Sequence, residues 1–308
     1  MRSLEKVVVV TRKTRLEGLI ERFNSRAQAK FYLDHSGGDF ADYEREDATY
    51  RRAVDTVRRT IDVGLKIQVV ERSLVPTMMF TGADAIMPVG QDGLVANTAK
   101  YVGEQPIIAV NPDPERFDGI LLRYSPAQAR TALLSLLDGR FRERQVTLAE
   151  ATLEDGQQLL AFNDLFIGAR SHVSARYKIG FAGRSEPQSS SGVLVSTGAG
   201  STGWLSSVFA MAGAVSTFSG GTPGRALHLE WEDPRLVFVV REPYVSRQSQ
   251  AGIAAGLIEA GGELVLESQM PSGGVIFSDG VEADALDFNS GARAHVRAAA
   301  RKTHLIVN

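Results

Sequence analysis

The chain has 308 residues, of which 44% are hydrophobic and 23% charged, and its formal net charge is −2. This length favours two domains over one, and the near-neutral charge gives no bulk attraction to nucleic acid or to an anionic membrane. The absence of cysteine excludes disulfides, thiolate catalysis and cysteine-ligated metal centres. No apolar run of about 18 residues predicts a transmembrane helix, and no segment reads as a signal peptide, so a cytoplasmic protein is expected.

The first part of the chain, from residue 1 to about residue 128, alternates strand-like apolar runs with helix-like stretches. In chain order, strands are predicted at Lys6–Thr11, Leu65–Val70, Ala83–Val89 and Pro106–Asn111, and helices at Tyr43–Asp62 and Leu94–Val102. This alternating order is typical of a parallel sheet with right-handed crossovers, whose strands are buried on both faces. We therefore predict a Rossmann-like α/β domain at residues 1–128.

The pattern changes after a further helix predicted at Pro126–Leu137, with Ser125 as its N-cap and Gly139 as its stop. Residues 129–308 carry many strand-like segments separated by Gly, Ser and Asp turns. These segments include Phe162–Gly168, Arg176–Phe181, Gly192–Ser196, Arg235–Val240, Glu263–Glu267 and Gly274–Phe277. We predict a β-rich, sandwich-like second domain.

Within this second domain one helix is predicted near Trp204–Ala214. The segments Ser185–Ser191 and Ser216–Gly224 are predicted to be loops, the second of them mobile, because they are rich in Ser, Gly and Pro. The tail from Arg297 to Asn308 could return to the first domain as a strand, and the sequence leaves that question open.

The first place for chemistry is Val89–Gly93, a glycine-rich turn between a buried strand and a helix. Ligands of open α/β sheets bind at the carboxyl ends of the strands, and a helix N-terminus there favours phosphate. Asp92 would then hold Mg²⁺ or take a proton from a hydroxyl group. The alternative is an ordinary turn that uses Gly for backbone freedom and Asp as a cap.

The second place is Thr197–Trp204, which holds several glycines, the hydroxyls of Ser201 and Thr202, and an indole that could stack on a base. A glycine turn with a hydroxyl N-cap and a core tryptophan is the competing interpretation.

Three further segments are weaker candidates. Asn163–Asp164 places an amide and a carboxylate in an apolar stretch, which suits a ribose diol or an adenine edge, or else a bulge. Asn111–Arg116 follows a predicted parallel strand, and Ser278–Gly280 alone indicates a hairpin turn.

Taken together and in this order, the segments resemble the NAD kinase family, within the diacylglycerol kinase/NAD kinase superfamily. The family's Gly-Gly-Asp-Gly turn matches Gly90–Gly93, its Asn-Glu pair matches Asn163–Asp164, and its Gly-Ser-Thr-Ala-Tyr segment matches Gly200–Trp204. A later Asp-Gly turn matches Asp279–Gly280. Several details resemble the mitochondrial branch: VNPDPER at 110–116, NDLFIG at 163–168, SSG at 190–192, REP at 241–243 and FNSGA at 288–292.

The resemblance implies a kinase that phosphorylates the adenosine 2′-hydroxyl of NAD or NADH with ATP and Mg²⁺, giving NADP(H). It implies Asp92 as the general base or as an organiser of Mg²⁺, with Gly90, Gln91 and Gly93 in the ATP phosphate turn. The dinucleotide-binding residues that it implies are Asn163, Asp164, Thr202, Gly203, Trp204, Ser207 and Asp279. It also implies a homo-oligomer, a dimer or larger.

The departures from the family pattern include Asp164 in place of a glutamate and Ser191 in place of the aspartate of many bacterial members, and two others concern the phosphate turn. Gln91 replaces the second glycine, which is costly if that residue needs a positive φ angle, and Leu94 replaces a threonine hydroxyl. Two alternatives therefore stay open: a relative that binds NAD or ATP without transferring phosphate, and a kinase for another hydroxyl compound such as a lipid.

Overall fold

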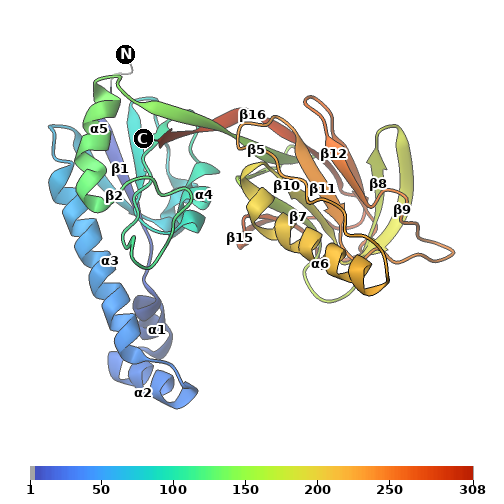
Figure 1. The fold of residues 1–308 in the computed structure, drawn as a ribbon, viewed down its shortest axis with the longest axis horizontal. Helices are drawn as coiled ribbons and strands as arrows, with labels where there is room; N and C mark the ends of the chain where they lie inside the picture. The colour runs from blue at the N-terminus through green and yellow to red at the C-terminus, as the bar shows by residue number, and fades with distance from the viewer. Residues whose placement is uncertain (1–3, 308) are drawn as a thin grey trace. The chain divides into compact units, whose positions relative to one another are not determined.

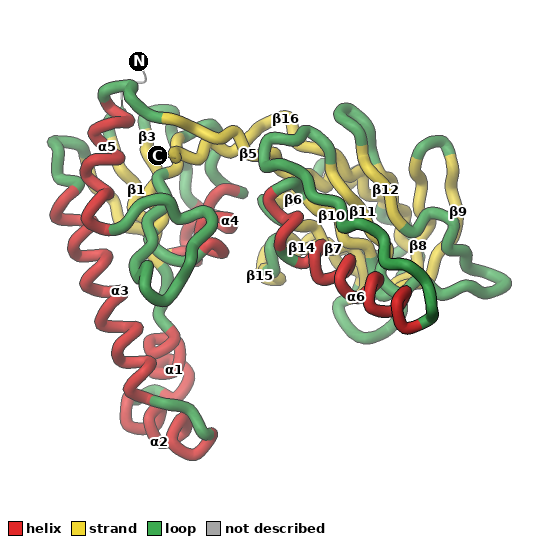
Figure 2. Tube along the Cα trace, in the orientation of Figure 1, coloured by secondary structure: helices red, strands yellow, loops and turns green. Residues whose placement is uncertain are grey.

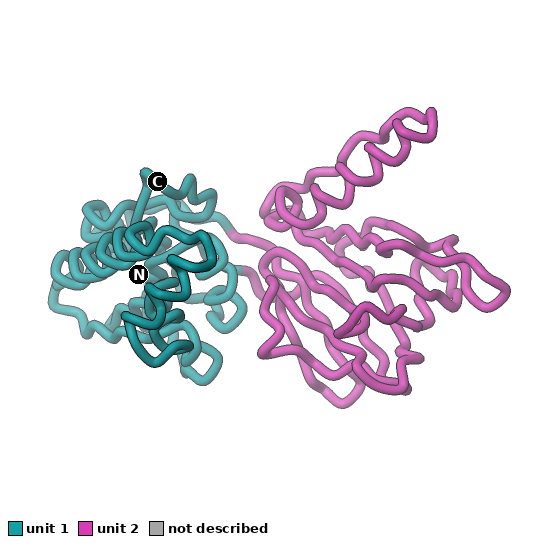
Figure 3. The backbone as a smooth tube through the Cα atoms, turned by 90° about the horizontal axis from the view of Figure 1, so that it is seen from below, with its two compact units in different colours: residues 1–144, 303–308 teal, residues 145–302 magenta. Residues whose placement is uncertain are grey.

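The computed structural model describes residues 4–307 and divides into two compact units (Figure 3). Unit 1 runs to Arg144 and also includes the segment from Thr303 onward, while unit 2 comprises Gln145–Lys302. The division after Arg144 comes later in the chain than the predicted boundary near residue 128.

Unit 1 is built on a parallel sheet. Its strands are β1 (Lys6–Thr11), β2 (Lys66–Glu71), β3 (Asp84–Pro88) and β4 (Pro106–Ile107). They lie in the order β2-β1-β3-β4, and every adjacent pair is parallel. Four consecutive valines, Val7–Val10, are fully buried because helices cover the sheet. The predicted α/β architecture is thereby confirmed.

The helices of unit 1 include two α-helices and one 3₁₀ helix that the sequence pattern did not predict (Figures 1 and 2). The full set is α1 (Arg15–Phe23), α2 (Arg26–Ser36), α3 (Phe40–Thr60), the 3₁₀ helix η1 (Arg72–Thr77), α4 (Asp92–Ala99), η2 (Pro126–Gln128) and α5 (Ala129–Leu137). The unpredicted helices α1 and α2 pack with the start of α3 around a small core of Leu16, Ala29, Leu33 and Phe40. A capping box joins Thr14 and Glu17 at the start of α1.

The predicted strand at Pro106–Asn111 forms only in part. The assigned strand covers only Pro106 and Ile107, although the amides of Ile108 and Val110 still donate to the carbonyls of Ile86 and Pro88, and Val110 makes isolated parallel bridges to Val89 and Tyr124. Tyr124 pairs beside the end of this segment, because its amide donates to the Ala109 carbonyl and its carbonyl accepts from the Asn111 amide.

Unit 2 is a sandwich of two largely antiparallel sheets. Its strands are β5 (Arg142–Leu153), β6 (Gln158–Ala161), β7 (Asp164–Ala169), β8 (Ala175–Phe181), β9 (Arg184–Ser190), β10 (Val193–Ser196), β11 (Leu236–Val240), β12 (Ala255–Ile258), β13 (Leu264–Ser268), β14 (Gly274–Ser278), β15 (Val281–Asp287) and β16 (Arg293–Val307). One sheet has the order β12-β11-β10-β7-β14-β15, and the other contains β16-β13-β8-β9 together with β5 and β6. Inward side chains such as Leu165, Val195, Tyr177 and Leu266 form one core between them. The predicted β-rich sandwich is confirmed.

The prediction of a loop at Ser185–Ser191 is wrong, because Arg184–Ser190 forms strand β9 and pairs with β8 along its whole length. Its inward side chains are polar, which hid the strand from a hydrophobic pattern. Glu186, Gln188 and Ser190 are buried, and the Tyr177 hydroxyl hydrogen-bonds to Gln188 and Ser190.

The prediction of a loop beginning at Ser216 is also partly wrong, because helix α6 runs from Trp204 to Phe218. The Thr217 hydroxyl donates to the carbonyl of Gly213 within the helix, and Gly220 supplies the positive φ just beyond its end. The first half of α6 packs on the sheet through Leu205, whereas Met211, Val215 and Phe218 are exposed.

Strand β16 belongs to both units. Its residues Arg293–Val296 pair antiparallel with β13 in unit 2, and His304 and Leu305 pair parallel with β4 in unit 1. The question that the sequence left open is thereby answered, since the tail does return as a strand.

Candidate active site

The Gly90–Gly93 turn of unit 1 joins the carboxyl end of β3 to the first turn of α4. Gln91 is the N-cap residue of α4 with φ −94° and ψ 169°, so its backbone is extended and tolerates a side chain. A positive φ at this position, the condition under which Gln91 would be costly, does not occur. Gln91 makes no side-chain capping hydrogen bond to the helix.

The two glycines of this turn differ in their surroundings. A Cβ on Gly90 would lie 2.6 Å from Leu94 Cδ2, so the leucine that replaces the family's threonine packs directly on Gly90. A Cβ on Gly93 would have nothing within 4 Å. Packing within the chain therefore explains Gly90 but does not explain Gly93, which lies exposed in the first turn of α4.

Asp92, the first residue of α4, accepts backbone hydrogen bonds with both carboxylate oxygens. Its Oδ2 accepts from the amide of Ile120 at 3.1 Å and its Oδ1 from the amide of Leu121 at 2.9 Å. No sequence pattern indicates this contact, because the partners are main-chain groups about 28 residues away. The carboxylate is thus fixed in orientation at the strand ends.

Tyr50 on α3 links the carboxyl ends of β1 and β3 beside the Gly90–Gly93 turn. Its hydroxyl accepts from the amide of Arg12, just beyond β1, at 2.8 Å and donates to the carbonyl of Val89, just beyond β3, at 2.9 Å. Burial raises the pKa of the Tyr50 hydroxyl to about 12, so it stays a donor at physiological pH. The sequence pattern predicted a helix at Tyr43–Asp62 but did not indicate this polar role of Tyr50.

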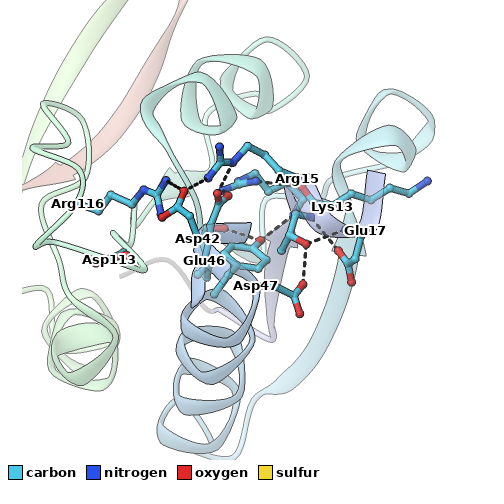
Figure 4. Close-up of polar contacts among 12 residues, drawn as sticks. Lys13, Arg15, Glu17, Asp42, Glu46, Asp47, Asp113 and Arg116 are labelled. Atoms are coloured by element: carbon cyan, nitrogen blue, oxygen red, sulfur yellow. Dashed lines mark hydrogen bonds and ion pairs between the residues drawn. The ribbon is translucent and has the colours of Figure 1, made fainter. Parts of the chain in front are cut away.

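A cluster of charged side chains holds the loop that follows β4. Figure 4 shows Asp42 between Arg15 and Arg116, with both Arg116 nitrogens within 3.1 Å of its carboxylate. The Arg116 and Arg15 guanidinium groups lower the pKa of Asp42 to about 2. Glu46 pairs with Arg12 and Arg15 beside them. Part of the predicted Asn111–Arg116 segment is therefore engaged within the chain.

In unit 2 the structure brings Asp279 against Asn163–Asp164, although 115 residues separate them. Asp279 Oδ1 accepts from the amides of Asn163 at 2.6 Å and Asp164 at 3.2 Å, and Oδ2 accepts from the amide of Phe162 at 2.9 Å. Burial raises the pKa of the Asp164 carboxyl to about 7, with Asp279 acting in the same direction and Ser196 opposing.

The Thr197–Trp204 segment packs against the same residues, Phe162 and Asn163. The Thr197 hydroxyl donates to the carbonyl of Phe162, and its amide donates to the carbonyl of Asn163. A Cβ on Gly200 would overlap the Asn163 carbonyl oxygen, and one on Gly198 would overlap that of Glu230. These two glycines are therefore required by close backbone packing.

The predicted dinucleotide-binding residues of this segment lie at the start of α6. Thr202, Gly203 and Ser207 are exposed, and Trp204 is half-buried. Ser201, by contrast, is buried, where its hydroxyl donates to Thr197 and accepts from the amide of Leu229.

Trp204 ends a row of stacked rings on the face of the sheet below α6. Its ring lies 5.7 Å from that of Phe166 at an interplanar angle of 11°, and the Arg241 guanidinium lies 5.3 Å from the indole. A Cβ on Gly168 or Gly192 would lie within 2.7 Å of the Phe166 ring. This packing explains why glycines occur in the NDLFIG and SSG segments.

Within residues 4–307, no group of three or more His, Cys, Asp or Glu side chains is arranged to hold a metal ion. Within the Gly90–Gly93 turn itself, the one acidic residue is Asp92. No helix in this described range is long and apolar enough to cross a membrane.

The chain is similar in sequence to two mitochondrial NAD kinases. No protein-family model matches the chain. Mitochondrial NAD kinase 2 of Rattus norvegicus is 25% identical over 316 aligned positions, covering 79% of this chain and 74% of the rat protein. The Homo sapiens counterpart is 27% identical over 251 positions, covering 65% of this chain and 57% of the human protein.

Two solved structures share the fold at 15% sequence identity. Yeast NADH kinase complexed with NADH has a TM-score of 0.58, covering 99% of this chain and 84% of the yeast chain. The NAD kinase from Archaeoglobus fulgidus in complex with ATP has a TM-score of 0.55, covering 97% of this chain and 92% of the archaeal chain. Sequence and fold comparisons therefore confirm the resemblance of this chain to the NAD kinase family.

Proposed function

We propose that this chain transfers the γ-phosphoryl group of ATP to the adenosine 2′-hydroxyl of NAD or NADH, giving NADP(H) and ADP. In this reaction a bond forms between the 2′-oxygen and the γ-phosphorus while the bond to the bridging oxygen of ADP breaks. Asp92 accepts the proton of the attacking hydroxyl. The place of Asp92, at the carboxyl end of β3 in a fold shared with NAD kinases, carries this proposal.

The surroundings of Asp92 support a phosphate ligand in two ways. The first turn of α4 lacks a side-chain cap, and uncapped helix N-termini offer N–H groups to anions. Glycine in a helix costs about 1 kcal/mol relative to alanine, so the unfilled space at Gly93 suits close approach by a ligand.

The Asp92 carboxylate is also suited to Mg²⁺ as this ion is usually coordinated at phosphate-binding sites. Such ions are held by one or two carboxylates, with substrate phosphates and water completing the shell. Asp92 is one such carboxylate, and its oxygens keep lone pairs beyond those used by the Ile120 and Leu121 amides. When bound, the ion neutralises charge on the phosphates.

In unit 2, Asn163, Asp164 and Trp204 are the groups that we assign to the dinucleotide. The Asp164 Oδ1 atom is buried and has no hydrogen-bond partner among the described residues, so a ligand hydroxyl or amide can satisfy it. The half-buried Trp204 ring offers one face to a base.

The test is to incubate the protein with NAD, ATP and Mg²⁺ and to detect NADP with an NADP-specific dehydrogenase. Asp92→Asn should abolish product formation while leaving the fold intact. Asp118→Asn is the matched control, because Asp118 is an exposed carboxylate close in sequence to the Asp92 partners Ile120 and Leu121. Full activity in Asp92→Asn would remove Asp92 from the proposed role.

A second candidate function is NAD binding without phosphoryl transfer. The observation that favours it is that backbone amides donate to both Asp92 oxygens. These hydrogen bonds restrict rotation of the carboxylate, and a base must turn toward the proton that it accepts. Calorimetric binding of NAD, with no NADP formed at high protein concentration, would favour this second function over the first.

A further inference from the structure

Asp279 lies in an unusual backbone position. It is the first residue of the two-residue turn between β14 and β15, with φ 53°, and Gly280 follows with φ 69°. Two successive positive φ angles are typical of a type I′ hairpin, in which Asp is one of the few residues other than Gly to occur. The conformation aims the Asp279 side chain back at the start of β7.

The Asp279 carboxylate serves the backbone of the 162–164 turn, which comprises Phe162, Asn163 and Asp164. Its two oxygens accept from all three amides of the turn, and its own amide donates to the Asp164 carbonyl at 3.0 Å. A carboxylate offers about four acceptor positions, and at least three of them are used here. This leaves Asp279 poorly suited to be a direct dinucleotide contact.

The carbonyl groups of the same turn are held from the opposite side. The Phe162 carbonyl accepts from the Thr197 hydroxyl at 2.6 Å, and the Asn163 carbonyl accepts from the Thr197 amide at 2.9 Å. Because the backbone is tied on both sides, the side chains of Asn163 and Asp164 remain as the groups that can serve a ligand.

Of the two neighbouring carboxyl groups, Asp164 and Asp279, it is Asp164 that can hold a proton. Its Oδ1 is buried without a hydrogen-bond partner among the described residues, whereas the Asp279 oxygens accept three backbone N–H groups, which favour the ionised form. Two adjacent carboxyls seldom both ionise in a buried place, so the proton belongs on Asp164.

We propose that Asp279 is a positioning residue: it folds the 162–164 turn, and its charge adds to burial in keeping the neighbouring Asp164 carboxyl protonated, so that Asp164 donates a hydrogen bond to the dinucleotide. The part that concerns the ligand rests on the proposed function, whereas the part that concerns the turn does not. The raised pKa of Asp164, caused first by burial and also by Asp279, agrees with this arrangement. The groups that act on Asp164 are Ser196 at the end of β10 and Asp279 in the hairpin turn.

The first test uses the ligand-free protein and therefore does not depend on catalysis. The carboxyl carbon of Asp164 is followed by NMR as the pH is raised, in the wild type and in Asp279→Asn. We expect a midpoint near pH 7 in the wild type and a lower midpoint in the variant, because the variant lacks the Asp279 charge. Asp287→Asn, which removes an exposed carboxylate on β15, should leave the midpoint unchanged.

The same samples report on the turn itself through hydrogen exchange. The amides of Phe162, Asn163 and Asp164 should exchange at least about tenfold faster in Asp279→Asn, because each loses its charged acceptor. Unchanged exchange together with an unchanged Asp164 midpoint would overturn the positioning role.

The second test measures NAD binding by calorimetry between pH 6 and 8.5. Wild-type affinity should fall by about tenfold for each pH unit above the midpoint, since only the protonated form donates. Asp164→Asn should bind with no such dependence. A flat wild-type profile would overturn the donor role of Asp164. Absence of NAD binding at every pH would instead refute the proposed function, whereas the NMR test of the Asp279 role in the ligand-free protein would remain valid.

Discussion

The buried Asp164 carboxyl should make the stability of unit 2 depend on pH, and Asp164→Asn should remove that dependence. Burial raises the pKa of this group from 3.8 to about 7. Because the folded value lies above the unfolded one, the folded protein holds the proton more tightly between these pH values. The stabilisation is therefore full below about pH 4 and is lost as the pH rises through 7.

The size of the effect follows from the same two values. Each pKa unit corresponds to about 1.4 kcal/mol, so a rise of about three units is worth at most about 4 kcal/mol. The free energy of unfolding of the wild type, minus that of Asp164→Asn, should thus fall by up to about 4 kcal/mol between pH 4 and pH 8. Other titrating groups cancel in this difference, since both proteins share them.

Urea unfolding followed by tryptophan fluorescence is the appropriate assay. The chain has two tryptophans, and both Trp204 and Trp231 lie in unit 2, so the signal reports on the unit that contains Asp164. Asp287→Asn is the control, because the Asp287 side chain is 80% exposed and should give a difference that does not change with pH. If the difference for Asp164→Asn stays constant within about 0.5 kcal/mol across this range, the reasoning from burial is wrong.

Three other changes test the packing around the candidate site. Tyr50→Phe leaves the Val89 carbonyl without its buried donor and should cost about 2 kcal/mol in chemical denaturation; a loss below about 0.5 kcal/mol would contradict the linking role. Gly198→Ala should destabilise unit 2 by more than about 3 kcal/mol, because its Cβ overlaps the Glu230 carbonyl, and a soluble variant with wild-type melting would disprove that close approach. Gly93→Ala should keep or raise the melting temperature, since the added Cβ meets nothing, yet lower NADP formation; full activity would exclude a phosphate contact at Gly93.

Much of the fold could be predicted from hydrophobic patterns alone. The buried runs at Lys6–Thr11 and Ala83–Val89 correspond to β1 and β3, because strands buried on both faces must be apolar throughout. Strand β9 escaped prediction for the opposite reason, since its inward residues are polar and satisfy one another with Tyr177. Helix α1 also escaped prediction, although its Thr14–Glu17 capping box is a recognisable start signal.

The candidate site was predictable as a set of motifs but not as a set of contacts. Spacing and residue type drew attention to Asp92 and to Asn163–Asp164, and these residues lie at strand ends. Their partners are mostly backbone groups, such as the Ile120 amide at Asp92, and a main-chain amide has no sequence signature. The bond from the Tyr50 hydroxyl to Val89 was hidden as well, because a tyrosine on a buried helix face reads as core.

The shared strand β16 also governs when unit 1 can be completed during synthesis. Its segment at His304 and Leu305 pairs with Pro106 and Ile107, so 198 residues separate His304 from its partner Pro106. A ribosome would have to translate all of unit 2 before β4 gained this neighbour. Until then the edge of β4 would carry unpaired backbone groups, a state in which nascent sheets associate wrongly.

Contacts between residues so distant in the chain also slow folding, because the intervening chain must be ordered before they can form. Unit 2 runs without interruption from Gln145 to Lys302, yet it also pairs distant strands, since β5 pairs with β16 and 147 residues separate Arg297 from Glu150. Both units therefore wait for β16, and a chain halted within unit 2 would hold a Gly90–Gly93 turn on an unfinished sheet.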